Sequence, residues 1–214
     1  MWSPYSANLQ KMGPSPVRRS LSSAGRSLNL VNETHANVAL GLRGRELMEY
    51  VQLGRTGTQV SKLCLGCMSY GTPGGPTHPW VISEADSEPF FKLAVESGIN
   101  FFDTADHYNY GENEEITGRM LKKYARRDEI VVATKVGLVM GDGPNKRGLS
   151  RKHILESIDA SLKRLQMDHV DLLYVHRLDP QTPPDELLEA LDQVVRAGKV
   201  IYPAASSMYA WQFA

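Results

Sequence analysis

Apolar runs that read as buried strands alternate with helical patterns along most of the chain. Four such runs end near residues 103, 135, 176 and 206, so they recur every 30 to 41 residues, and an earlier run covers residues 62–66. Between the runs, apolar side chains recur at helical spacing, as at Ile154, Ile158, Leu162 and Leu165. This alternation predicts an α/β fold with a parallel sheet and outer helices.

The helices are expected at about residues 83–97 and 112–126, from about Ser150 onward, and from Thr182 to a stop at Gly198. Thr182 is the expected N-cap of the last of these, because a hydroxyl there can accept a backbone N–H. A further helix is expected to open near Trp211. A short hairpin around residues 54–57 precedes the first strand.

Four side chains that can hold or move a proton lie at or just past the ends of three predicted strands. Asp103, Lys135 and His176 close their strands, and Tyr108 follows Asp103 by five residues. Because the C-terminal ends of parallel strands in a β/α repeat meet on one face, we expect these four side chains to converge. A phenol, an amine, a carboxylate and an imidazole together form a proton-donating centre.

Free tyrosine and lysine side chains both titrate at about pH 10, which suits neither to proton transfer near neutrality. A nearby ammonium favours a phenolate, and a carboxylate holds that ammonium charged and in place. Tyr108 could then protonate a developing alkoxide that His176 orients by a hydrogen bond. The alternative is structural: Asp103 and Lys135 form an ion pair, Tyr108 packs in a loop, and His176 is a satisfied strand-end histidine. Because all four residues lie at corresponding positions at the strand ends, the catalytic interpretation is favoured over the structural one.

Several segments resemble the aldo-keto reductase family. They are residues 103–108 with Gly111 and Glu114-Glu115, then 133–135, 171–177, 51–57 and 65–68. The resemblance covers about residues 48–214 and points to the microbial and fungal branch related to potassium-channel β-subunits. In the channel-subunit branch the position of His176 is commonly Asn, so His176 favours the enzymatic side.

The resemblance implies a (β/α)8 barrel of the TIM type, NADPH or NADP as cofactor, and a small carbonyl or alcohol as substrate. It implies a catalytic set of Tyr108, Asp103, Lys135 and His176. The implied cofactor contacts are Gly66, Cys67, Met68, Asp103, Ser206 and Ser207. Trp80, Asn109 and Tyr110 lie in loops above the catalytic set and are candidates for lining a substrate pocket, with ordinary loop packing as the alternative.

Only five of the eight β/α units of such a barrel are readable, so the barrel is expected to be incomplete at its C-terminal end. Pro203 also departs from the family pattern, since proline is disfavoured in a central strand and tolerated at an edge. Three functions follow. The first is an NADPH-dependent oxidoreductase that interconverts a carbonyl and an alcohol. The others are a fragment without activity and a non-catalytic binding protein like the channel subunits.

Composition excludes few classes. Lys plus Arg equals Asp plus Glu at 24 each, so no net charge points to nucleic acid or a membrane as partner. We expect a cytoplasmic protein without a metal site. Cys64 and Cys67 form a C-x-x-C spacing, but i and i+3 side chains of a strand point to opposite faces, which disfavours a disulfide.

Residues 1–47 differ from the rest of the chain. They hold six basic residues (Lys11, Arg18, Arg19, Arg26, Arg43 and Arg45) and two acidic ones (Glu33 and Glu46), a net charge of +4. We expect a disordered N-terminal extension before a domain that begins at Met48. Apolar residues at helical spacing with interleaved arginines leave a mitochondrial presequence as a weaker alternative.

Overall fold

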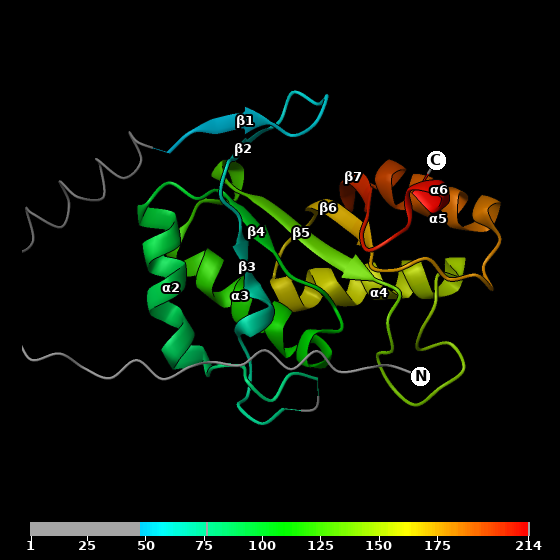
Figure 1. Ribbon diagram of the computed structural model, residues 1–214, viewed down its shortest axis with the longest axis horizontal. Helices are drawn as coiled ribbons and strands as arrows, with labels where there is room; N and C mark the ends of the chain where they lie inside the picture. The colour runs from blue at the N-terminus through cyan, green and yellow to red at the C-terminus, as the bar shows by residue number, and fades with distance from the viewer. Residues whose placement is uncertain (1–47, 76, 214) are drawn as a thin grey trace, which may run out of the picture.

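The computed structural model describes residues 48–75 and 77–213. Its main element is a five-stranded parallel sheet in which the strands lie side by side in chain order (Figure 1). The strands are β3 (Leu65–Gly66), β4 (Phe101–Asp103), β5 (Val131–Val136), β6 (Val170–Val175) and β7 (Val200–Ala205). Such an order forms one wall of a β/α barrel, because each unit is added beside the one before it. The predicted fold class is confirmed.

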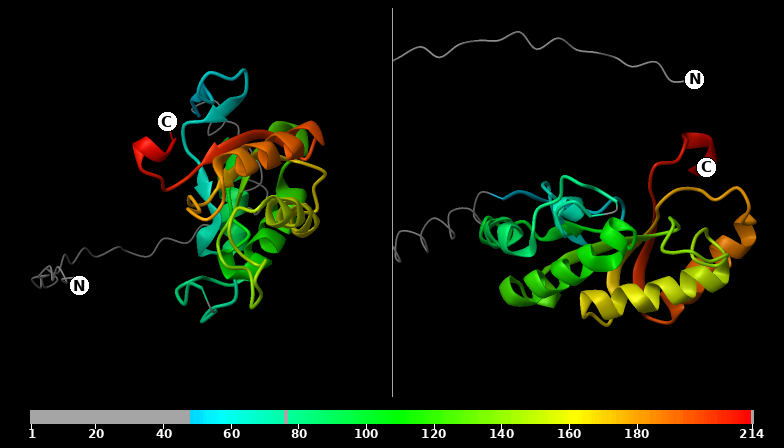
Figure 2. Two further views of the ribbon diagram at one scale, coloured as in Figure 1. Left: turned by 90° about the vertical axis from the view of Figure 1, so that its right-hand side faces the viewer. Right: turned by 90° about the horizontal axis from the view of Figure 1, so that it is seen from below.

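Four helices cover one face of this sheet, and a short fifth helix follows β7. They are α2 (Glu84–Glu96), α3 (Glu112–Tyr124), α4 (Arg151–Leu165), α5 (Pro184–Arg196) and α6 (Ala210–Phe213). Figures 1 and 2 show α2 to α5 in an arc on the same side of the sheet. The first four helices lie within about two residues of their predicted bounds.

The helix-facing side of the sheet holds the main core. Phe102 and Val132 are fully buried there and pack with Ile116 of α3 and Ile154 of α4. Successive strand side chains point to opposite faces, so the neighbours of these core residues face the other way. This alternation separates an apolar helix side from a more mixed open side.

The open side of the sheet carries a smaller apolar cluster and, beyond it, the polar residues of interest. Val131, Ala133 and Leu172 form this cluster with Val60 of the hairpin. Every second side chain of a strand points to the same face. Counting in steps of two along each strand from the residues of this cluster therefore reaches Asp103, Lys135 and His176. The strand pattern alone therefore puts the three polar side chains on one face and at one end.

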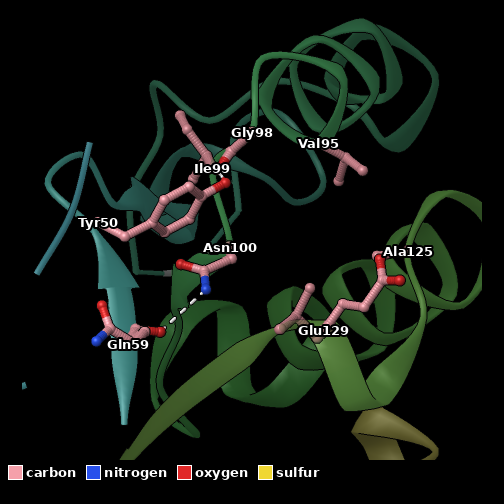
Figure 3. Close-up of a pocket in the computed structure, with 9 residues that line it drawn as sticks. Tyr50, Gln59, Val95, Gly98, Ile99, Asn100, Ala125 and Glu129 are labelled. Atoms are coloured by element: carbon pink, nitrogen blue, oxygen red, sulfur yellow. Dashed lines mark hydrogen bonds between the residues drawn. The ribbon is translucent and has the colours of Figure 1, made fainter. Parts of the chain in front are cut away.

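The hairpin of β1 (Tyr50–Gln52) and β2 (Gln59–Ser61) lies at the opposite end, where the strands begin (Figure 1). Tyr50 donates its hydroxyl proton to the carbonyl of Gly98 at 2.7 Å, and Asn100 donates to the carbonyl of Gln59 at 3.1 Å. A cavity of about 500 Å³ lies between the hairpin and the ends of α2 and α3 (Figure 3). The hairpin thus closes the end of the sheet remote from Lys135.

A side chain caps the start of two of the four helices α2 to α5, whereas α3 has Gly111 as its N-cap, without a side-chain bond. Ser83 and Ser150 accept backbone N–H groups of Asp86 and His153 as the N-caps of α2 and α4. The prediction for Thr182 is wrong, because Pro183 is the N-cap of α5 and has no side chain that can accept a bond. Thr182 instead donates its hydroxyl proton to Asp179 at 2.7 Å.

Strands β3 and β7 are the two edges of the described sheet. Pro203 lies in β7, opposite Leu173 of β6. An edge strand has one side free of ladder partners, so a missing N–H is tolerated there. This agrees with the edge alternative for Pro203. The predictions for residues 1–47 lie outside the described residues, and the domain start at residue 48 stays a prediction.

Candidate active site

Three neighbouring strands bring Asp103, Lys135 and His176 to one end of the open face. Asp103 is the last residue of β4, Lys135 is next to last in β5, and His176 directly follows β6. The backbone N–H of His176 donates to the carbonyl of Val136 at 2.9 Å, which extends the ladder one residue past the strand. The three side chains therefore depend on regular strand geometry rather than on a long loop.

The chain after β4 stays bonded to β5, and this places Tyr108. The N–H of Thr104 donates to the carbonyl of Ala133 at 2.9 Å, and the N–H of Asp106 donates to that of Lys135 at 3.2 Å. The turn away from the sheet comes only after these bonds. Tyr108 consequently lies back over the strand ends and is 8% exposed.

Lys135 is the centre of the site. Its Nζ donates to Asp103 Oδ2 at 2.6 Å, to the Thr104 carbonyl at 2.9 Å and to the Tyr108 hydroxyl at 3.3 Å. These bonds use all three hydrogens of the ammonium, whose residue is 6% exposed. A buried charge needs such partners, and Asp103 supplies the opposite charge. The ammonium is thus fixed beside the phenol oxygen.

His176 lies on the other side of the phenol. The rings of Tyr108 and His176 meet edge to face, with centroids 5.8 Å apart. Burial lowers the pKa of His176 to about 4, and the positive charges of Lys135, His107 and Arg177 act in the same direction. Among the described residues, its Nδ1 has no hydrogen-bond partner. Because Nδ1 is enclosed, a substrate oxygen could hydrogen-bond this neutral imidazole only through its other ring nitrogen.

We expect the His176 imidazole to stay neutral from pH 8 down to pH 5 and to titrate near pH 4. The unfolded chain takes up this proton at about pH 6.5 and the folded chain only near pH 4, so acidification through this window should cost stability. NMR titration of the imidazole signals measures the folded value, and His176→Gln assigns the signal by its loss. A titration midpoint near 6.5 for that signal contradicts the expectation.

The residues predicted to hold a cofactor divide between the two faces. Gly66 pairs with Asp103 in the register of β3 and β4 and is exposed, as is Met68. The thiol of Cys67 instead packs in the helix-side core and is fully buried, so the side chain cannot reach the open face. Ser206 and Ser207 follow β7, with their hydroxyl oxygens 3.3 Å apart. The other C-x-x-C cysteine, Cys64, is exposed, and both thiols are free.

The residues predicted to line a substrate pocket occupy different surroundings. Trp80 is 54% exposed, and its ring lies 5.0 Å from that of His78, which in turn lies 5.9 Å from Tyr108. Asn109 is buried and bonded to a neighbouring loop rather than open to a pocket. Tyr110 lines a cavity of about 370 Å³ together with residues of α4 such as Arg164. Only Trp80 lies on the Tyr108 side with an accessible ring.

Buried polar residues below Tyr108 were not predicted from the sequence. Asn113 of α3 accepts from the Thr104 hydroxyl at 2.5 Å and donates to two backbone carbonyls of the segment after β3. Glu114, fully buried, accepts from Thr134 at 2.5 Å and from Arg164 at 2.7 Å. The Asn113 bonds tie the segment after β4 to the segment after β3, and the Glu114 bonds tie α3 to β5 and α4. Asn113 and Glu114 lie in the first turn of the helix that follows a strand end, and this position was the sequence signal that could have identified them.

Asp106 is a second feature that sequence reasoning missed. Its carboxyl group is fully buried and has no hydrogen-bond partner among the described residues. Burial raises the pKa of this carboxyl well above its ordinary value, and the nearby charge of Glu114 adds to the shift. The neutral acid therefore predominates at a pH where an exposed aspartate is ionised.

Among residues 48–75 and 77–213, no cluster of three or more His, Cys, Asp or Glu side chains could hold a metal ion. In the same residues, no helix has the length and apolar character needed to cross a membrane.

Comparison with known proteins gives the family of this chain. The sequence model described as the Aldo/keto reductase family matches residues 62–214. The versiconal hemiacetal acetate reductase of Aspergillus parasiticus is 44% identical over 184 residues, which cover 78% of this chain and 53% of that protein. A probable voltage-gated potassium channel subunit beta of Arabidopsis thaliana is 39% identical over 77% of this chain and 48% of its own length.

A solved structure shows the same fold. The holo form of an aldo-keto reductase from Bacillus halodurans superimposes with a TM-score of 0.64 at 36% sequence identity, covering 75% of this chain and 50% of that one. The chain spans about half the length of the curated relatives it matches. The family match extends over most of the described residues and includes Asp103, Tyr108, Lys135 and His176. The chain belongs to the aldo-keto reductase family.

Proposed function

We propose that the protein is an NADPH-dependent oxidoreductase that reduces an aldehyde or ketone to an alcohol, or catalyses the reverse oxidation. The observation that carries this proposal is the pair of bonds from Lys135 Nζ, one to Asp103 at 2.6 Å and one to the Tyr108 hydroxyl at 3.3 Å. An ammonium held in this way stabilises negative charge on the phenol oxygen. That is what a tyrosine needs to release a proton to substrate.

The open face beside these residues fits the nicotinamide end of the cofactor. A Cβ added to Gly66 would meet no heavy atom within 4 Å, so the surface next to Asp103 is open. Ser206 and Ser207 offer hydroxyls at the end of β7, which suit the donors and acceptors of a carboxamide. We propose Gly66, Met68, Asp103, Ser206 and Ser207 as contacts, with Cys67 contributing only through its backbone.

The bound nicotinamide supplies a hydride, and the residues of this chain supply the proton and the electrostatics. As the carbonyl carbon gains the hydride, its oxygen becomes an alkoxide and takes the hydroxyl proton of Tyr108. Lys135 stabilises the phenolate that remains, and Asp103 keeps the ammonium in place. Neutral His176 holds the same oxygen by a hydrogen bond. Tyr108 then regains a proton from solvent, and each step reverses in alcohol oxidation.

The experiment is a cofactor and carbonyl assay on the purified full-length gene product. We expect absorbance at 340 nm to fall when NADPH is mixed with aliphatic or aromatic aldehydes, with turnover in the common range of about 1–10³ s⁻¹. NADPH is expected to bind more tightly than NADH, which a fluorescence titration measures. Tight NADPH binding without turnover of any carbonyl or alcohol would favour a non-catalytic binding protein instead.

A further inference from the structure

The backbone directly after Tyr108 is left-handed over three successive residues. The φ angles of Asn109, Tyr110 and Gly111 are 47°, 51° and 95°. This region is unfavourable for residues with a Cβ, although asparagine tolerates it better than most. A strained stretch of this kind persists only where its surroundings hold it. The contacts that hold it come from residues 71–75 and 77–80, here named the β3–α2 loop.

Asn109 makes these contacts with both its backbone and its side chain. Its N–H donates to the Thr77 hydroxyl oxygen at 3.0 Å, and the same hydroxyl donates to Asn109 Oδ1 at 2.7 Å. Asn109 Nδ2 donates to Glu112 Oε2 at 3.2 Å. The residue is 7% exposed, so water competes poorly for these bonds.

The loop backbone also packs closely on the Asn109 amide. A Cβ on Gly71 would lie 1.9 Å from Asn109 Nδ2, and one on Gly75 would lie 3.2 Å from it. Glu112 adds a second tie, because its carboxylate accepts the N–H and hydroxyl of Thr72 at 2.9 and 2.6 Å. The loop is therefore fastened to the turn at two points, and the amide fills the space between them.

The same loop carries His78, whose ring borders Tyr108, and Trp80, whose ring lies beside that of His78. His78 meets the Tyr108 ring edge to face at 5.9 Å, and Trp80 lies 5.0 Å from His78. The His78 ring also contacts the Thr77 hydroxyl at 3.1 Å, the group that bonds Asn109. A shift of Thr77 would therefore move both rings relative to the phenol.

We propose that Asn109 is a positioning residue that couples the β3–α2 loop to Tyr108 and so sets how a bulky carbonyl substrate is held beside the phenol. This proposal rests on the proposed function. A substrate large enough to reach His78 and Trp80 depends on the tie, whereas a small aldehyde touches only the groups around Tyr108. Asn109 thus acts on substrate selection through the loop and not on proton transfer itself.

Kinetics of the full-length gene product provide the first test. Thr77→Val and Asn109→Gly each remove the hydrogen bond from the Thr77 hydroxyl to Asn109 Oδ1, here called the tie. Asn109→Gly also keeps a residue that suits the left-handed backbone. We expect KM for a bulky aromatic aldehyde to rise about tenfold, as for one or two lost hydrogen bonds, while kcat and the KM for propanal change little. Thr77→Ser should restore the wild-type values. Equal changes for both aldehydes, or none for either, contradict the proposal.

Hydrogen exchange tests the tie without any activity. In Thr77→Val we expect amides of residues 71–75, 77–80 and 105–112 to exchange about tenfold faster by mass spectrometry, because the Asn109 N–H loses its acceptor. Thr56→Val, which removes a hairpin hydroxyl at the other end of the sheet, is the matched control and should leave both segments unchanged. Unchanged exchange in Thr77→Val overturns the tie, whereas absent turnover with faster exchange rejects only the proposed function.

Discussion

Replacing Tyr108 with phenylalanine is expected to lower kcat for carbonyl reduction by about 10²–10⁴-fold, the usual cost of losing a general acid. The phenol oxygen is the atom that Lys135 Nζ approaches to 3.3 Å, and the substitution removes only that atom. The ring stays edge to face with His176, so the packing around the site is retained. Steady-state oxidation of NADPH by an aldehyde measures the loss.

Tyr50→Phe is the matched control for this substitution. It also removes one phenol oxygen. Tyr50 lies in the hairpin at the far end of the sheet, and its hydroxyl donates to the carbonyl of Gly98, which follows α2. We expect its kcat to equal that of the wild type. If Tyr108→Phe and Tyr50→Phe behave alike, Tyr108 is not the proton donor, and the bond from Lys135 has a structural role only.

Replacing Lys135 with methionine should lower turnover at neutral pH by at least about 10²-fold in the alcohol-oxidation direction, which needs the phenolate as base. Methionine keeps much of the buried volume but removes the ammonium that bonds both Asp103 and Tyr108. Without that ammonium, the negative charge that develops on the phenol oxygen is less stabilised, so kcat/KM for oxidation should fall across the pH range. Carbonyl reduction passes through the same charge on the phenol oxygen and should also slow.

The measurement is the pH profile of kcat/KM for alcohol oxidation in the wild type and in Lys135→Met. Lys122→Met removes a lysine on the exposed side of α3 whose Nζ donates to Gln166, and it serves as control. Superimposable profiles for Lys135→Met and the wild type would show that the ammonium does not act on Tyr108. The ion pair with Asp103 would then be a structural feature of the strand ends.

Most of the fold was predictable because its signals are local. The strand-like runs and the helical spacing of residues such as Ile154 and Ile158 predict the units and their order. The alternation of side chains along β4, β5 and β6 then predicts that Asp103, Lys135 and His176 share a face. The error at Thr182 arose because α5 begins one residue later than expected, with Pro183 rather than Thr182 as its N-cap. A boundary shift of one residue is not visible in the local sequence.

Loop geometry was less predictable than the strand ends. Asn109 and Tyr110 were expected to line a pocket, but the left-handed turn after Tyr108 directs Asn109 into the β3–α2 loop and Tyr110 to a cavity on the helix side. The buried carboxyl of Asp106 has the charge of Arg164 of α4 nearby, a residue 58 positions further along the chain. Tertiary contacts, rather than periodicity, decide where such side chains point.

The most direct test of the central claim is to follow the hydride itself. The full-length gene product is mixed with NADPH that carries deuterium at both C4 positions and with an aldehyde that it reduces, and the alcohol is examined by mass spectrometry. Hydride transfer beside Asp103, Tyr108, Lys135 and His176 predicts deuterium on the former carbonyl carbon, and Tyr108→Phe should form this deuterated alcohol about 10²–10⁴-fold more slowly. An alcohol without deuterium, or no alcohol at saturating cofactor and aldehyde, would contradict the account.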